Sequence, residues 1–197
     1  MIQLAIGFLT GVLGSTFVSY IKRRSAEEKK PDTIAEAVTN ANVIHDQLDK
    51  VLIEFEPDRI WIAQFHNGGH YYPTGKSIQK FSFFFEAVKH AKHSVQSNFQ
   101  NIPVNLFSRA LGYLLTVDYI EIADYKDETV ATYGLKYVAE EYGSKSSYLF
   151  AIRNFENRLI GVVGMDYVTK KRKLDTAELT LLRLEATKIG GVLTSHI

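Results

Sequence analysis

The sequence contains no cysteine. This absence excludes disulfide bonds, thiolate nucleophiles, and zinc or iron–sulfur sites held by cysteine. An excess of either charge sign is also missing, since 23 lysines and arginines stand against 22 aspartates and glutamates. A chain with so even a balance has no large uniform field to attract nucleic acid. We therefore expect no nucleic-acid partner.

Patterns typical of catalytic and metal sites are missing as well. We find no nucleophile beside a base, no spaced carboxylate pair and no metal-ligating set. His66 and His70 are separated by two glycines, so we expect His66 to bond the loop backbone and His70 to face solvent rather than a metal. The run Gly69–Ser77 nearly matches a phosphate-binding loop, but its glycines are one residue too far apart and an aromatic segment, not a helix, follows. We expect a protein that is not an enzyme and has no metal or cofactor.

The N-terminus has a long uncharged stretch, Ile2–Ile21, whose length in a helix matches the roughly 30 Å of bilayer hydrocarbon. The basic cluster Lys22–Arg24 follows the stretch, whereas a signal peptide carries its basic residues in front. We therefore expect residues 1–21 to form an uncleaved transmembrane helix; a signal peptide and a buried helix are the alternatives. The positive-inside rule then puts the charged linker of residues 22–33 and the rest of the chain on the cytoplasmic side of the inner membrane.

Two predicted helices at the ends of the folded part carry matching apolar seams. Apolar residues recur at alternating spacings of three and four along Ile34–Phe55 and again along Leu179–Leu193. The second helix starts at a capping box, Asp175–Glu178. We expect a homodimer through these two helices. The alternative is that each seam packs on its own domain, as amphipathic helices usually do.

The stretch Arg59–Glu86 is the expected centre of the fold. Its first part is apolar on both faces, with Ile60 and Ile62 on one and Trp61 on the other, which predicts a buried central strand. We expect the chain to leave this strand in a glycine turn at residues 66–70, to form a loop, and to return as an aromatic strand at residues 81–85.

The remaining elements follow from periodicity and turn residues. The sequence predicts an exposed strand or strand-like loop at 90–101, a helix from Pro103, a strand at 119–124, a helix at 128–142 that ends at Gly143, and a hairpin of 147–153 with 159–168. This order predicts an α+β fold in which a central, largely antiparallel sheet has the terminal helices on one face and the middle helices on the other.

Three features carry a family resemblance: this order of elements, the closing hairpin YLFAIRN…NRLIGVVGMDYV and the capped helix DTAELTLLRLEATKI. Through them the chain resembles the GAF-domain family of sensory modules over residues 34–197. The resemblance implies a ligand pocket between the sheet and the middle helices, and dimerisation through the terminal helices. Bilin-binding and methionine-sulfoxide-reducing members use cysteines, which this chain lacks, and the Asn-Lys…Phe…Asp-Glu pattern of cyclic-nucleotide binders is missing. An unassigned small molecule, or no ligand, remains.

Polar and aromatic residues near the implied pocket form the candidate ligand site. Its cations suit an anionic ligand and its carboxylates are possible counter-charges, although charges at strand ends are commonly solvated and the aromatics equally suit a core or a protein-docking surface. The candidate ligand-binding residues are His66, Asn67, Tyr71, Tyr72, Lys76, Lys80, Glu86, Arg153 and Asp166.

Two classes of function remain open at this stage. The first is a membrane-anchored cytoplasmic GAF-like module, not catalytic, that binds a small ligand or a protein partner. The second is a ligand-free structural or interaction protein of a membrane complex or a virus-encoded assembly.

Overall fold

The computed structural model describes residues 33–71 and 73–194. The expected transmembrane helix and linker of residues 1–32, Tyr72 and residues 195–197 lie outside the described residues. Within the described part of the chain, no helix is both long enough and apolar enough to cross a membrane. The chain divides into units of residues 1–39 and 40–197. The first unit contributes the beginning of helix α2 (Thr33–Phe55). The second unit contains the rest of α2 and all the later helices and strands that the structure describes.

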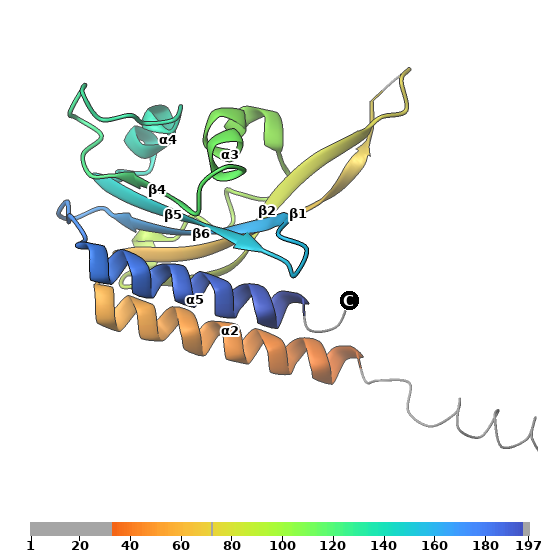
Figure 1. Ribbon diagram of the computed structural model, residues 1–197, viewed down its shortest axis with the longest axis horizontal. Coiled ribbons are helices and arrows are strands. Elements are labelled where there is room, and N and C mark those ends of the chain that lie inside the picture. The colour runs from red at the N-terminus through yellow and green to blue at the C-terminus, as the bar shows by residue number, and fades with distance from the viewer. Residues whose placement is uncertain (1–32, 72, 195–197) are drawn as a thin grey trace, which may run out of the picture. The chain divides into compact units, whose positions relative to one another are not determined.

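The second unit is built on a six-stranded sheet in the order β3-β2-β1-β6-β5-β4 (Figure 1). All five neighbouring strand pairs are antiparallel, as the sequence predicts. β1 and β6 lie at the centre, and β1 is mostly buried over residues 59–63, while its end at residues 67–70 is largely exposed. The strands are β1 (Arg59–His70), β2 (Ser77–Val88), β3 (Ile102–Pro103), β4 (Tyr119–Ile122), β5 (Ser146–Arg153) and β6 (Leu159–Tyr167).

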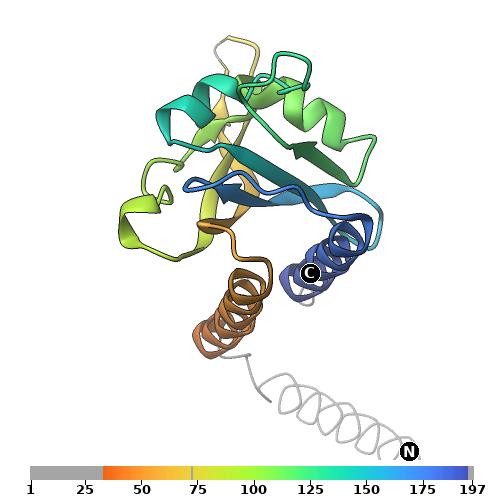
Figure 2. The same cartoon turned by 90° about the vertical axis from the view of Figure 1, so that its left-hand side faces the viewer.

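Helices cover the sheet on both faces (Figure 2). α2 and α5 (Thr176–Thr194) lie on one face, and α3 (Ser108–Leu114) and α4 (Lys136–Glu141) on the other. Each face has its own apolar core. This is the arrangement of terminal and middle helices that the element order predicts.

The alternation of side chains along β1 separates the two cores. Ile60 and Ile62 are fully buried on the side of α2 and α5. Trp61, Ala63 and Phe65 point to the opposite core, with α3 and α4. Burying one large apolar side chain stabilises a fold by about 1.5–3 kcal/mol, so this strand is strongly fixed in register.

The two apolar seams pack on the sheet of their own chain. Ile44, Leu48, Val51 and Phe55 of α2 are buried in one core with Leu179, Leu182, Ala186 and Ile189 of α5. This is the alternative that the sequence left open, and it occupies most of the surface on which the dimer was expected. Ile34, where the first seam starts, is 75% exposed, and the outer faces of the two helices expose Ile53, Leu181 and Leu184, so the dimer stays a prediction.

The predicted capping box is confirmed at the start of α5. The Asp175 carboxylate accepts a hydrogen bond from the Glu178 amide at 2.8 Å, and the Glu178 carboxylate accepts one from the Asp175 amide at 2.9 Å. Two amides that a helix N-terminus leaves without partners are thereby satisfied.

The glycine turn expected at residues 66–70 is wrong, because β1 continues to His70, which still pairs with Ser77 of β2. The sheet absorbs the glycines through a register shift between Asn67 and His70, where Gly69 has a φ of +97°. The chain reverses instead at Tyr71–Lys76, where the Tyr71 amide donates to the Lys76 carbonyl at 2.8 Å. We name the part of this hairpin from Phe65 to Lys80 the β1–β2 arm.

Two further expectations differ from the structure. The helix predicted at 128–142 is reduced to α4, because Tyr133 and Gly134 have φ of +50° and +82°, which no α-helix accommodates. The segment 90–101 forms the short 3₁₀ helix Ala91–His93 and turns rather than a strand. The helix after Pro103 is confirmed, but it starts as the 3₁₀ turn Val104–Phe107 before α3.

Candidate functional site

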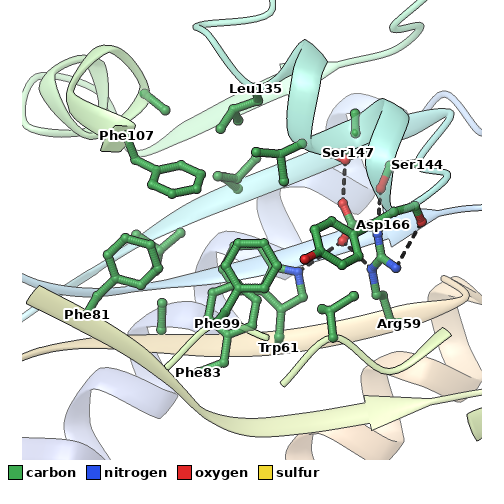
Figure 3. A pocket seen from close by; sticks show the side chains of 18 of the residues that line it. Arg59, Trp61, Phe81, Phe83, Phe99, Phe107, Leu135, Ser144, Ser147 and Asp166 are labelled. Carbon is green, nitrogen blue, oxygen red and sulfur yellow. Dashed lines mark hydrogen bonds and ion pairs between the residues drawn. The ribbon is translucent and has the colours of Figure 1, made fainter. Parts of the chain in front are cut away.

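A cavity of about 80 Å³ lies between the sheet and the layer of α3 and α4 (Figure 3). It is well above the ~10–15 Å³ that one water molecule needs and well below the ~300–1,000 Å³ of pockets for drug-sized ligands. Its lining comes from β1, β2, β5 and β6, from both middle helices, and from the segment between β2 and β3. The residues that line it include Arg59, Trp61, Phe81, Phe83, Val95, Phe99, Phe107, Ala110, Tyr125, Ala139, Ser144, Ser147 and Asp166.

One side of the cavity is aromatic. The rings of Trp61 and Phe83 stack with centroids 4.1 Å apart, and Phe83 stacks in turn on Phe99 at 4.6 Å, with interplanar angles of 11° and 10°. Phe107 meets Phe81 edge to face at 5.2 Å. Ring pairs of these geometries contribute about 0.5–1.5 kcal/mol each beyond the area they bury, so the aromatic wall is rigid.

The other side is a buried ion pair. Arg59 Nε lies 2.7 Å from Asp166 Oδ2, and the two residues are 3% and 7% exposed. The same carboxylate oxygen accepts a hydrogen bond from Trp61 Nε1 at 3.0 Å, and Oδ1 accepts one from the Ser147 hydroxyl at 2.5 Å. Asp166 therefore holds both the charged side of the cavity and the first ring of its aromatic wall.

Arg59 also joins the cavity to the segments around it. Its Nη1 donates to the carbonyls of His93 at 3.2 Å and Tyr142 at 3.3 Å, and its Nη2 donates to the Ser144 hydroxyl at 2.6 Å. Burial, together with the charge of Asp166, raises the pKa of the Tyr125 phenol, so this side chain is neutral at physiological pH. The polar side thus has zero net charge.

Residues 89–101, between β2 and β3, form a segment that closes the cavity with Val95 and Phe99, and we name it the closing segment. Glu86 holds this segment: its carboxylate accepts hydrogen bonds from the Ser94 hydroxyl at 2.5 Å and the Val95 amide at 2.8 Å. The backbone of Phe99 accepts a further bond from the Phe83 amide at 2.9 Å.

The same segment carries His93, which forms a second buried polar pair with Asp58. The imidazole Nδ1 is 3.7 Å from the carboxylate, and none of the residues that the structure describes is its hydrogen-bond partner. Burial lowers the pKa of His93, and the nearby Asp58 charge offsets this only in part. Burial alone would raise the pKa of Asp58, but hydrogen bonds from the amides of Thr169 and Val168 and from the Thr169 hydroxyl outweigh it and lower that pKa.

The structure brings one of the predicted ligand-binding residues, Asp166, to the cavity. Glu86 is not among the lining residues, and its hydrogen bonds hold the closing segment. Arg153 lies elsewhere, where its Nη2 donates to the carbonyls of Leu114 at 2.8 Å and Val117 at 3.3 Å, after α3. It lines a separate, more polar hollow of about 530 Å³ between α5 and the β5–β6 turn.

The other predicted residues that the structure describes lie on the β1–β2 arm, outside the lining of the cavity. His66 Nε2 is 2.9 Å from the Ser82 hydroxyl, and Asn67 accepts a bond from Gln79 Nε2 at 3.2 Å. The remaining ones are Tyr71 and Lys76, both exposed, the half-buried Lys80, and Tyr72, which lies outside the described residues.

Arg59, Trp61, Tyr125, Ser144 and Ser147 were not among the predicted site residues. The strand alternation already placed Trp61 on the face opposite Ile60, and Arg59 shares that face by the same period. What was missing is the pairing of β1 with β6, which sets Arg59 opposite Asp166. Within residues 33–71 and 73–194, no group of three or more histidine and carboxylate side chains is placed to hold a metal ion.

No protein-family model matches the chain, and no curated protein matches it significantly. Solved structures do. The blue-light-absorbing GAF domain of the receptor PixJ from Thermosynechococcus elongatus superimposes with a TM-score of 0.65 at 11% identity, over 84% of this chain and 90% of that one. The GAF-domain region of a proposed membrane protein from Geobacter sulfurreducens gives 0.60 at 13% identity, over 84% and 99%. A domain of a proposed two-component sensor histidine kinase from Sinorhizobium meliloti gives 0.54 at 16% identity, over 77% and 89%.

Proposed function

We propose that this chain, whose fold is that of GAF domains, is a membrane-anchored cytoplasmic sensor module that binds a small ligand in the cavity and is not catalytic. The observation that carries the proposal is the cavity itself: an apolar space with an aromatic wall and one cluster of convergent polar groups, between the sheet and the middle helices. Ligand sites have this composition, with few polar groups in a largely apolar lining.

The cavity also limits what the ligand can be. PixJ is a cyanobacteriochrome, and another structural relative is described with bound biliverdin. This chain has no cysteine for a thioether to a pigment, and about 80 Å³ is too small for a tetrapyrrole without a large rearrangement. The ligand we propose is therefore smaller than a bilin.

The membrane anchor and the cytoplasmic location of the domain are part of the same proposal. Their support is the uncharged stretch Ile2–Ile21 with its following basic cluster, and the description of the Geobacter relative as a proposed membrane protein. A ligand that shifts the closing segment would change the contact of Arg59 with the His93 carbonyl, and so the packing around β1.

Native mass spectrometry of the full chain, purified from its own host, tests the ligand. We expect an additional mass that disappears on denaturation. It should be absent from an Ala110→Leu variant, whose larger side chain fills the cavity, and present in Ala177→Leu, which makes the same change at an exposed position of α5. A bare protein, or a mass that Ala110→Leu retains while folded, would argue against a ligand in this cavity.

A second candidate function, a protein-interaction module, is favoured by the exposed apolar side chains on the outer faces of α2 and α5. Ile53 is 80% exposed, and Leu181 and Leu184 are each about half exposed. A self-associating chain would show a dimer in the same spectra that Leu181→Glu with Leu184→Glu abolishes. Tyr137→Glu, at an exposed position on α4, is the matched control and should leave the dimer intact.

A further inference from the structure

We infer that the ligand of the cavity is a small, uncharged molecule with a single aromatic ring and one polar substituent. The inference rests on the proposed function, since it assumes that the cavity binds a ligand. Four properties of the lining lead to it: the size of the space, its charge, its aromatic wall and one unused hydrogen-bond donor.

The size limits the ligand to about one ring. An engineered apolar cavity of roughly 150 Å³ holds benzene, and the present cavity of about 80 Å³ is of that order. Val95 and Phe99, which close the cavity, belong to a segment outside the strands, so any widening of the space would have to come from this segment.

The charge of the lining excludes a charged ligand. Arg59 and Asp166 neutralise each other at 2.7 Å, and Asp166 has already accepted three hydrogen bonds. A carboxylate, phosphate or ammonium ligand would enter a largely apolar site in which no opposite charge remains for it. Burying an ion without a partner is strongly unfavourable.

The wall favours an aromatic ligand over an aliphatic one. Eight of the 21 lining residues are aromatic, against 12% of the whole chain, and six of them already contact one another in ring pairs. A ligand ring extends these ring–ring contacts, whereas an aliphatic ring of the same size gains only from apolar burial. One such contact corresponds to a preference of roughly two- to tenfold.

One N–H group of Arg59 can donate a hydrogen bond to the polar substituent. A guanidinium has five N–H groups. Nε, both donors of Nη1 and one of Nη2 have acceptors on Asp166, His93, Tyr142 and Ser144. The second N–H of Nη2 has no acceptor among the described residues, and Ser144 beside it also lines the cavity. A hydroxyl or carbonyl oxygen on the ligand ring suits this donor.

The protein carries its own reporter for the test. Trp61 is the single tryptophan of the sequence and lines the cavity, so its fluorescence responds to occupancy without interference from another indole. We would titrate the full chain with phenol, with cyclohexanol as the aliphatic molecule with the same number of carbon and oxygen atoms, and with benzoate as the charged aromatic. Ala110→Leu and Ala177→Leu are titrated in parallel, with far-ultraviolet circular dichroism to show that both are folded.

We expect phenol to give a saturable change that Ala110→Leu loses and Ala177→Leu keeps. Cyclohexanol should bind roughly two- to tenfold more weakly, and benzoate at least about tenfold more weakly. Cyclohexanol or benzoate binding as tightly as phenol would overturn the inference and leave the proposed ligand site standing.

A failure of all three probes is resolved by the mass spectra. If a co-purified mass that depends on Ala110 is present, the cavity binds a different class of molecule, and the inference alone is overturned. If no such mass is present either, the proposed ligand-binding function falls with it.

Discussion

Removing the Asp166 carboxylate should destabilise the protein far more than removing an exposed carboxylate. Asp166→Ala takes away the acceptor of Arg59 Nε, Trp61 Nε1 and the Ser147 hydroxyl, and leaves the Arg59 charge buried. Breaking a buried ion pair from one side costs about 3–5 kcal/mol. Arg59 keeps its bonds to two carbonyls and to Ser144, so we expect the lower end, about 3 kcal/mol.

The assay is thermal unfolding of the full chain, followed by circular dichroism. For a domain of this size, ~3 kcal/mol corresponds to a fall in Tm of about 6–12 °C. Asp118→Ala is the matched control, because its ion pair with Arg183 is about half exposed and such pairs contribute about 0–1 kcal/mol. A fall in Tm for Asp166→Ala no larger than for Asp118→Ala would refute the reasoning.

A double variant separates the loss of the pair from the exposure of one charge. In Arg59→Met with Asp166→Leu, no buried charge remains, and replacing a buried ion pair by apolar residues is often neutral or stabilising. We therefore expect the double variant to be more stable than Asp166→Ala. If it is less stable, the hydrogen bonds of Arg59 to the surrounding carbonyls contribute more than its charge costs.

Two further predictions concern pH and packing. The lowered pKa of His93 means that the folded protein binds the proton of this side chain more weakly than the unfolded chain does. The contribution of His93 to stability should therefore be constant above about pH 6.5 and decrease as the pH falls below it. Tm measured from about pH 7.5 to about 5.5 should fall less in His93→Gln than in the wild type, and equal slopes would contradict this. A Cβ at position 164 would lie 2.0 Å from the Trp61 ring, so Gly164→Ala should displace the indole and reduce the free energy of unfolding by about 1–3 kcal/mol. The displacement should shift the fluorescence of Trp61, and an unchanged spectrum would contradict the packing described.

The elements that carry strong local signals were predicted correctly. β1 is apolar on both faces, the capping box at Asp175 fixes the start of α5, and the hairpin of β5 and β6 has its turn residues between two apolar runs. Weak or conflicting local signals led to errors. The glycines after Phe65 indicated a turn, but pairing with β2 kept them in the strand, and Tyr133 and Gly134 ended the helical pattern before α4.

By itself the sequence determined the fold class, since the period of apolar residues depends only on whether each segment is a helix or a strand. It also determined which residues of β1 face which core. Only the tertiary structure decided the site. Arg59 and Asp166 are 107 residues apart and meet through the register of β1 with β6, while Glu86 and Arg153 are drawn into hydrogen bonds that support neighbouring segments. Contacts of this kind depend on how strands pair across the sheet, which no local pattern in the chain specifies.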